Sequence, residues 1–288
     1  MHDPLKNRDN QLDTKQIELR IQADIDAYCI KQYSDGPRNH LGASIIGNDC
    51  QAYSWNTFRW LKQEQFSGRM YRLFQRGHLE EARFVSYLVG IGFEVKEIDA
   101  ATQKQFRISG AKGHFGGSLD ALMKAPASYG LEEDLVWLGE FKTHSEKSFL
   151  KLQKDGVIVS KPQHYSQMSA YGRAYNLKYG LYCAVNKNND DLYIKIIELN
   201  WRLADDLFRK AESIIFARQQ PPKIAQTEAF FDCKYCDFKG ICHAGKKPEI
   251  NCRSCRFAIP VDNGEWYCER LKTQLSGMSP CEYYERIV

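Results

Sequence analysis

Residues 117–142 read GSLDALMKAPASYGLEEDLVWLGEFK, and the fold is organised around the end of this stretch. Residues 135–142 form a candidate strand. Side chains alternate between the two faces of a strand, so Glu140 and Lys142 point to one side and Phe141 to the other. The apolar run Val-Trp-Leu at 136–138 predicts that this strand is buried. A buried glutamate and lysine destabilise a fold unless they pair or bind a ligand. The stretch therefore indicates both a central strand and a functional site.

Asp120 precedes Glu140 by twenty positions. A divalent cation held by Asp120 and Glu140 would offset the cost of burying the charges. Mg²⁺ favours a couple of carboxylates together with water and phosphate oxygens. Such a cation activates water and neutralises phosphate charge, and Lys142 could orient the attacking water. The alternative interpretation is a surface ion pair on an edge strand.

The rest of the chain alternates between helical and extended patterns, which predicts an α/β fold with a mixed central sheet flanked by helices. The Pro221-Pro222 pair marks a boundary, beyond which cysteine spacing replaces apolar periodicity. We expect helices at 14–34, 50–66, 68–90, 163–176 and 202–218, and strands at 93–98, 105–109, 114–123, 135–142, 181–185 and 192–199.

Two further motifs flank the carboxylates in the expected order. Gly77-His78 lies on a predicted helix upstream, and Gln167-Met-Ser-Ala-Tyr171 lies on a predicted helix downstream. Glutamine and tyrosine four residues apart share a helix face. With Asp120 and the Glu140-x-Lys142 pair, this pattern resembles the PD-(D/E)xK nuclease superfamily, and in particular its RecB-like branch.

The resemblance implies a restriction-endonuclease-like core and a set of functional residues. In that family Mg²⁺ or Mn²⁺ is bound by side chains matching His78, Asp120 and Glu140, together with the backbone carbonyl of Phe141. Lys142, Gln167 and Tyr171 match the catalytic lysine and the glutamine–tyrosine pair that contacts DNA or that lysine. A histidine on a helix face and a tyrosine in a core are the plain alternatives for His78 and Tyr171.

A cysteine motif closes this region of similarity. Cys233, Cys236 and Cys242 form C-x₂-C-x₅-C, and three thiolates need a fourth ligand. Iron–sulfur members of the RecB-like branch, such as the CRISPR-adaptation exonuclease and AddB-type domains, take it from far upstream, where Cys50 stands here. The resemblance thus implies a [4Fe–4S] cluster. A zinc site completed by His243 or a later cysteine is the alternative.

The last 45 residues form a separate cysteine-rich, metal-binding C-terminal module. Their spacing, C-x₂-C-x₁₂-C-x₁₂-C, suits structural Zn²⁺. The zinc ligands would be Cys252, Cys255, Cys268 and Cys281. Basic and aromatic residues among them would form either a surface for single-stranded DNA or the small core of the module. These residues are Arg253, Arg256, Phe257, Trp266, Tyr267, Arg270 and Lys272.

Composition is compatible with this organisation. The 288 residues are 43% hydrophobic, which allows a sizeable core, and the net charge of +4 permits nucleic-acid binding without demonstrating it. The first sixteen residues lack an apolar signal region, and no stretch is apolar enough to span a membrane. We therefore expect a cytoplasmic protein with reduced cysteines and no membrane association. The isolated Cys29 and Cys183 are expected to be buried.

The combined expectation is a metal-dependent DNA exonuclease that acts on ends or single strands in recombination, repair or DNA capture. DNA is its expected partner, together with a helicase or recombination protein. We expect an N-terminal helical extension at 1–39, a nuclease domain at 40–243 closed by the iron–sulfur cluster, and the cysteine module at 244–288. Two alternatives remain open: a structure-specific or restriction-type endonuclease, and a non-catalytic nucleic-acid-binding protein.

Overall fold

A five-stranded mixed sheet carries the stretch around Glu140. The computed structural model of the protein describes residues 13–132 and 134–288. The sheet has the order β10-β9-β8-β7-β2, in which β8 and β9 are parallel and the other pairs antiparallel. Its strands are β2 (Glu94–Lys96), β7 (Ala121–Lys124), β8 (Val136–His144), β9 (Tyr179–Asn186) and β10 (Leu192–Glu198). The predicted α/β class with a mixed sheet is confirmed.

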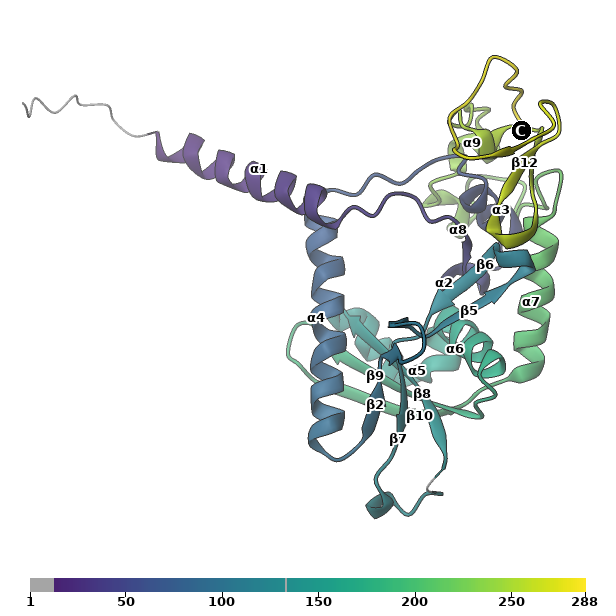
Figure 1. The fold of residues 1–288 in the computed structure, drawn as a ribbon. Helices are drawn as coiled ribbons and strands as arrows, with labels where there is room; N and C mark the ends of the chain where they lie inside the picture. The colour runs from purple at the N-terminus through teal and green to yellow at the C-terminus, as the bar shows by residue number, and fades with distance from the viewer. Residues whose placement is uncertain (1–12, 133) are drawn as a thin grey trace, which may run out of the picture. The chain divides into compact units, whose positions relative to one another are not determined.

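Helices cover both faces of this sheet, as Figure 1 shows. On one face, Phe84 of α4 (Gly68–Gly90) stacks on Phe141 of β8 with ring centroids 5.5 Å apart. On the other face, Leu138 and Tyr182 pack in one buried cluster with Phe149 of α5 (Glu146–Ser160) and with α6 (Pro162–Ala174). Glu140 and Lys142 share the parity of Leu138, so the strand presents them to the α5–α6 side.

Smaller elements complete this part of the chain. Parallel pairing of Leu41 with Phe115 joins β1 to β6, and β5 extends that sheet. The elements are β1 (Leu41–Gly42), α2 (Ala43–Ile46), α3 (Gln51–Phe58), β3 (Ile98–Asp99), β4 (Lys104–Gln105), β5 (Arg107–Gly110), β6 (Phe115–Ser118), α7 (Trp201–Ile215), α8 (Phe231–Lys234) and α9 (Lys239–His243).

The chain divides into two compact units. One comprises the described residues up to Gly36 together with Gln65–Arg76; the other comprises Pro37–Glu64 and Gly77–Val288. The first holds α1 (Thr14–Tyr33), which Asp13 caps by accepting a hydrogen bond from the Gln16 amide at 3.1 Å. An ion pair between Arg72 and Asp26 joins α1 to the start of α4. None of the described helices has the length and hydrophobicity that a membrane crossing would require.

The secondary structure differs from the expected one at three places. The helix expected at 50–66 ends at Phe58, because Trp60 adopts a left-handed backbone with φ of 50°. The strand expected at 114–123 is divided between β6 and β7, which belong to different sheets. The helix α5 was not expected; it contains Gly156 at φ 70°, which interrupts the apolar periodicity. Cys29 and Cys183 are buried, as predicted.

The C-terminal region packs into the second unit. It forms a small antiparallel sheet of β11 (Ala258–Pro260), β12 (Trp266–Cys268) and β13 (Thr273–Leu275). Trp266 is 1% exposed and belongs to the same buried cluster as Phe58 and Trp55. Of the two alternatives for Trp266, a surface for DNA or a place in the core, the structure therefore supports the core.

Two buried arginines attach this region to the rest of the unit. The Arg253 guanidinium donates to the carbonyl oxygens of Asn39 at 2.7 Å and Phe58 at 3.2 Å. That of Arg59 donates in the other direction, to the carbonyl oxygen of Ala258 at 2.7 Å. Burial lowers the pKa of Arg59 to about 10 and that of Arg253 to about 9. Arg253 is 1% exposed, which excludes the alternative that places it on a DNA-binding surface.

We predict that Arg253→Ala lowers the free energy of unfolding by about 2–4 kcal/mol, because the buried carbonyl oxygen of Phe58 and the part-buried one of Asn39 lose their donor and a cavity opens. Urea denaturation measures the change. Arg256→Ala is the matched control: Arg256 is exposed, with Glu285 at 3.3 Å and the Phe257 ring centroid at 5.9 Å, so the change should stay within about 0.5 kcal/mol. Equal stability of the two variants would contradict the attachment role.

Candidate active site

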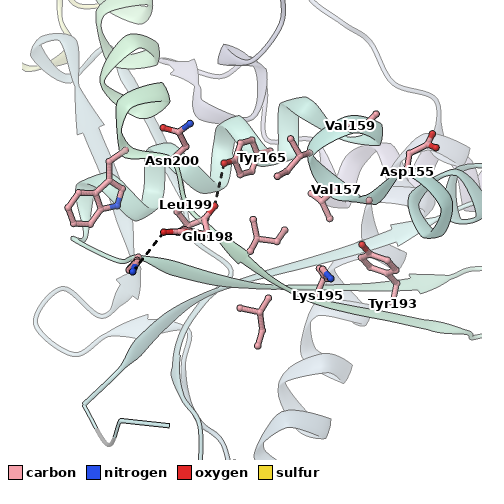
Figure 2. A pocket seen from close by; sticks show the side chains of 15 residues that line it. Asp155, Val157, Val159, Tyr165, Tyr193, Lys195, Glu198, Leu199 and Asn200 are labelled. Carbon is pink, nitrogen blue, oxygen red and sulfur yellow. Dashed lines mark hydrogen bonds and ion pairs between the residues drawn. The ribbon is translucent and has the colours of Figure 1, made fainter.

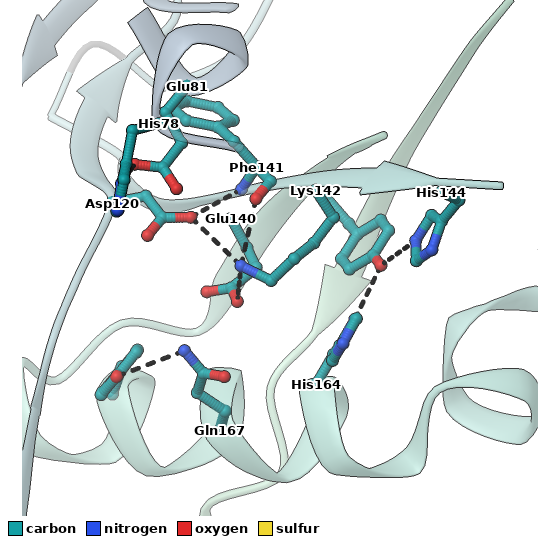
Figure 3. A network of polar contacts seen from close by, with 11 residues as sticks. His78, Glu81, Asp120, Glu140, Phe141, Lys142, His144, His164 and Gln167 are labelled. Atoms are coloured by element: carbon teal, nitrogen blue, oxygen red, sulfur yellow. Dashed lines mark hydrogen bonds and ion pairs between the residues drawn. The ribbon is translucent and has the colours of Figure 1, made fainter. Parts of the chain in front are cut away.

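Asp120, Glu140 and Lys142 meet at the edge between β7 and β8 (Figure 3). Asp120 lies in the short link between β6 and β7, and the other two lie on β8. The Asp120 Oδ2 atom accepts a hydrogen bond from the Phe141 amide at 2.8 Å and lies 3.4 Å from Lys142 Nζ. Lys142 Nζ also lies 2.6 Å from Glu140 Oε1. The backbone of β8 thus fixes the orientation of both carboxylates around the ammonium group.

Glu140 is a fully buried carboxylate, with 0% exposure. Lys142 Nζ pairs with its Oε1 atom at 2.6 Å, whereas no residue in 13–132 or 134–288 donates a hydrogen bond to Oε2. Burial raises the pKa of Glu140, the charge of Lys142 opposes the shift, Asp120 adds to it, and the resulting pKa is about 7. A buried carboxylate with unused lone pairs is unfavourable unless a cation binds to it.

Lys142 stays charged despite its surroundings. Burial alone would lower its pKa, but the carboxylates of Glu140 and Asp120 outweigh burial and raise it. Lys142 Nζ also donates to the carbonyl oxygen of Phe141 at 3.1 Å. The carbonyl that the family resemblance assigns to the metal is therefore bonded to the lysine in this structure.

Helix α6 places two predicted residues opposite β8. Gln167 and Tyr171 are buried, and Gln167 Nε2 donates to Tyr171 Oη at 3.3 Å. Tyr171 lies against Gly117, where a Cβ atom would collide with the Tyr171 hydroxyl and lie 3.0 Å from Ala43 Cβ. The glycine before Asp120 therefore lets the tyrosine approach the site.

His78 and Glu81 extend the site from α4. The His78 side chain is 69% exposed, and its Nδ1 lies 3.5 Å from Glu81 Oε2. Burial and then the charge of Asp120 raise the pKa of Glu81, so this carboxylate lies near the cluster. Sequence reasoning missed Glu81, although its position three residues after His78 on one helix would have suggested it.

The carboxylate oxygens of Asp120 and Glu140 are suitable ligands for a hard divalent cation that also binds water and substrate oxygens. Within the described residues, no three His, Cys, Asp or Glu side chains are arranged around one point as ligands of a single ion. Mg²⁺ does not require such a cage, because it binds through one or two carboxylates and substrate phosphates. The acceptor atoms of Asp120 and Glu140 meet that requirement.

Four cysteines distant in sequence line one small cavity of about 20 Å³. They are Cys50, Cys233, Cys236 and Cys242, and His243 lines it as well. Asn56 Nδ2 lies 3.5 Å from Cys242 Sγ, an N–H···S contact. Burial, reinforced by the neighbouring thiols, raises the pKa values of Cys236 and Cys242. The residues around this cavity would have to move less to admit a single ion than to admit a four-iron cluster.

The remaining four predicted cysteines line a second cavity, of about 70 Å³. They are Cys252, Cys255, Cys268 and Cys281. Burial raises the pKa of Cys252 to about 11, with further contributions from the three other thiols. Each predicted set of four thus lines its own cavity, although in the described part of the chain no three thiols of either set are arranged as ligands of a single ion.

A cavity of about 970 Å³, larger than the two cysteine-lined cavities, lies elsewhere. Figure 2 shows the residues that line it. It is bordered by β10 and the end of α5, with Tyr165, Tyr193 and Trp201 among its lining residues. Asp120, Glu140 and Lys142 do not line it. Cavity size therefore does not locate the cluster of charged residues.

Comparison with known proteins gives structural similarities only. No family model and no curated protein matches the sequence. The structure of SSO0001 is 16% identical with a TM-score of 0.45, covering 80% of this chain and 100% of that one. An alkaline exonuclease from Laribacter hongkongensis, LHK-Exo, is 17% identical with a TM-score of 0.42, covering 67% and 90%. Its complex with dAMP is 14% identical with a TM-score of 0.41 and the same coverage. These values establish no family.

We predict that Gly117→Ala lowers the free energy of unfolding by about 1–3 kcal/mol, because the new methyl group displaces Tyr171. Gly77→Ala is the control. Gly77 lies within helix α4, and a Cβ there meets no atom within 4 Å, so the substitution should stabilise the protein by up to about 1 kcal/mol. Thermal or urea unfolding distinguishes them. A Gly117→Ala protein as stable as the wild type would show that the close approach is unimportant.

Proposed function

We propose that this protein is a DNA nuclease that uses Mg²⁺ or Mn²⁺, with a RecB-like PD-(D/E)xK active site. One observation carries the proposal: Glu140 is fully buried, no described residue donates a hydrogen bond to its Oε2, and it shares the single ammonium of Lys142 with Asp120. Two carboxylates with one positive charge between them are unfavourable in a buried site, because desolvating an uncompensated charge costs several kcal/mol.

Each residue of the site has a distinct role in the proposed reaction. Asp120 and Glu140 would hold the cation, and Phe141 would contribute its carbonyl oxygen. When bound, a divalent cation neutralises phosphate charge and lowers the pKa of water. Lys142 orients the attacking water and stabilises negative charge that develops on the phosphate. The Gln167–Tyr171 pair faces the same site from α6 and would align either the strand or the lysine. His78, with Glu81, would complete the metal environment from α4.

We predict that Glu140→Gln abolishes Mg²⁺- or Mn²⁺-dependent cleavage of end-labelled DNA while the protein remains folded. The substitution keeps the shape but removes the charge that the cation needs. Glu94→Gln is the control: Glu94 lies on the same sheet, is exposed and pairs with Lys96 at 2.7 Å, so activity should be unchanged. Undiminished cleavage by Glu140→Gln would exclude the assigned site.

Circular substrates separate the two catalytic alternatives in the same assay. We propose exonuclease action on ends or single strands, in recombination, repair or DNA capture beside a helicase or recombination protein. Linear single strands should then be degraded while covalently closed single-stranded circles survive. Rapid cleavage of the circles would instead indicate an endonuclease. DNA binding without any cleavage would indicate the non-catalytic alternative.

The two cysteine sets are proposed as separate metal centres in a chain organised as an extension at 1–39, a nuclease domain at 40–243 and a module at 244–288. Cys50, Cys233, Cys236 and Cys242 would bind a [4Fe–4S] cluster that links the two ends of the nuclease domain. The four thiols of the last module would bind structural Zn²⁺. That each set lines a cavity of its own supports two centres, and the small first cavity keeps zinc as the alternative there.

We predict that anaerobically purified protein is brown and contains about four irons and about one zinc per chain. Cys50→Ser should remove the iron and destabilise the fold, because metal binding contributes to folding free energy. Cys268→Ser should remove only the zinc. Metal analysis of Cys183→Ala, which alters an unrelated buried thiol, is the control. Two zincs and no iron in the wild-type protein would refute the cluster.

A further inference from the structure

A second row of polar side chains runs beside Lys142, and the nuclease chemistry above does not use it. His144, on the same strand face as Glu140 and Lys142, places its Nε2 3.0 Å from Tyr182 Oη. The same hydroxyl lies 2.8 Å from His164 Nδ1 on α6. Figure 3 shows the two imidazoles on either side of the hydroxyl, next to Lys142. At the other end, His144 Nδ1 lies 3.2 Å from Ser148 Oγ.

Lys161 constrains one end of this chain. Its Nζ donates to Ser148 Oγ at 2.5 Å, so the serine accepts there and has one proton left to give. If Ser148 donates that proton to His144 Nδ1, then His144 Nε2 carries the imidazole hydrogen and donates to Tyr182 Oη. The tyrosine in turn donates to His164 Nδ1, and the hydrogen without a described acceptor is then the one on His164 Nε2. In the reverse direction that hydrogen is the one on Ser148 instead. The forward direction is therefore the one that leaves a donor on α6, and successive bonds of one direction strengthen each other.

The inner residues of this chain are buried, and the ring of His164 at its end is partly exposed. Tyr182 is 0% exposed and His144 is 7% exposed, whereas His164 is half-buried. Burial, followed by the charges of Lys142 and Lys161, lowers the pKa values of His144 to about 4 and His164 to about 3, so both rings are neutral. With Nδ1 accepting from Tyr182, the neutral His164 ring carries its hydrogen on Nε2. No described residue accepts that hydrogen.

His164 also lies at the favourable end of α6 for an anion. The helix starts at Pro162, so His164 is in its first turn, where free backbone N–H groups and the helix dipole attract negative charge. Lys142 acts electrostatically on His164 from the neighbouring strand. Three features therefore meet at one place: a fixed neutral donor, a helix N-terminus and a nearby ammonium group.

We propose that His164 Nε2–H binds a phosphate of the DNA strand next to the one held at Asp120, Glu140 and Lys142, and that Ser148, His144 and Tyr182 are positioning residues that hold it in the donor tautomer. The proposal rests on the proposed nuclease function. A neutral donor contributes binding and alignment of the strand without competing with the carboxylates for the cation.

The test combines kinetics with a spectroscopic signature of the chain. His164→Ala should raise KM for a linear single-stranded oligonucleotide about tenfold, the effect of losing one hydrogen bond to a charged group, with little change in kcat. His164→Gln, whose amide N–H replaces Nε2–H, should restore most of the loss. Tyr182→Phe should have the effect of His164→Ala. Tyr193→Phe is its control, because the Tyr193 ring packs on Tyr182 with centroids 6.3 Å apart, while its hydroxyl bonds to no described residue.

Nitrogen-15 NMR of the imidazole rings reads the chain without any cleavage. The wild-type protein should show His164 as the Nε2–H tautomer, with resonances that shift when a short oligodeoxynucleotide is added without divalent cation. Tyr182→Phe should abolish that preference. An Nδ1–H tautomer at His164, or an unchanged KM for His164→Ala in an enzyme that cleaves DNA, would overturn the proposal. If the wild type does not cleave DNA, the nuclease function fails, and the tautomer and the oligonucleotide shift still decide the role of His164.

Discussion

The buried carboxylate of Glu140 is the constraint on which the account depends. A charge in the centre of a sheet is tolerated only where an opposite charge compensates for it, and here one ammonium group lies beside two carboxylates. Lys142 lies 2.6 Å away on the same strand, and Asp120 is fixed by the Phe141 amide at 2.8 Å. The alternation of β8 keeps Phe141 on the opposite face, where it packs on Phe84. One strand thus supplies both the hydrophobic core and the polar site.

The two faces of β8 explain how the unit is held together. The side that faces α4 is apolar, while the side that faces α6 carries Glu140, Lys142 and His144 in sequence. Rigid packing around α6 leaves little room for adjustment, as Gly117 against Tyr171 illustrates. Far from this site, Arg59 and Arg253 donate to backbone carbonyl oxygens across the junction with the C-terminal sheet. Both arginines donate to carbonyl oxygens of residues that are distant in sequence.

The features that could be predicted from the sequence are those that depend on residues close together in the chain. The common face of Glu140 and Lys142 follows from the two-residue period of a strand, and a mixed α/β fold follows from alternating patterns. The burial of Arg253 could not be predicted, because its acceptors are carbonyl oxygens of Asn39 and Phe58 far along the chain. The His144–Tyr182–His164 chain joins two strands and a helix, and no spacing rule connects them. Glu81 is different, since its helical position relative to His78 was readable.

Mn²⁺ bound to crystals of the wild-type protein tests the central claim most directly, because anomalous scattering locates the ion without reference to activity. The account predicts a strong peak within coordination distance of Asp120 and Glu140, and its loss in crystals of the Glu140→Gln variant. A peak elsewhere, or none between these carboxylates when Mn²⁺ is abundant, would contradict the claim that the buried charge of Glu140 exists to hold a cation.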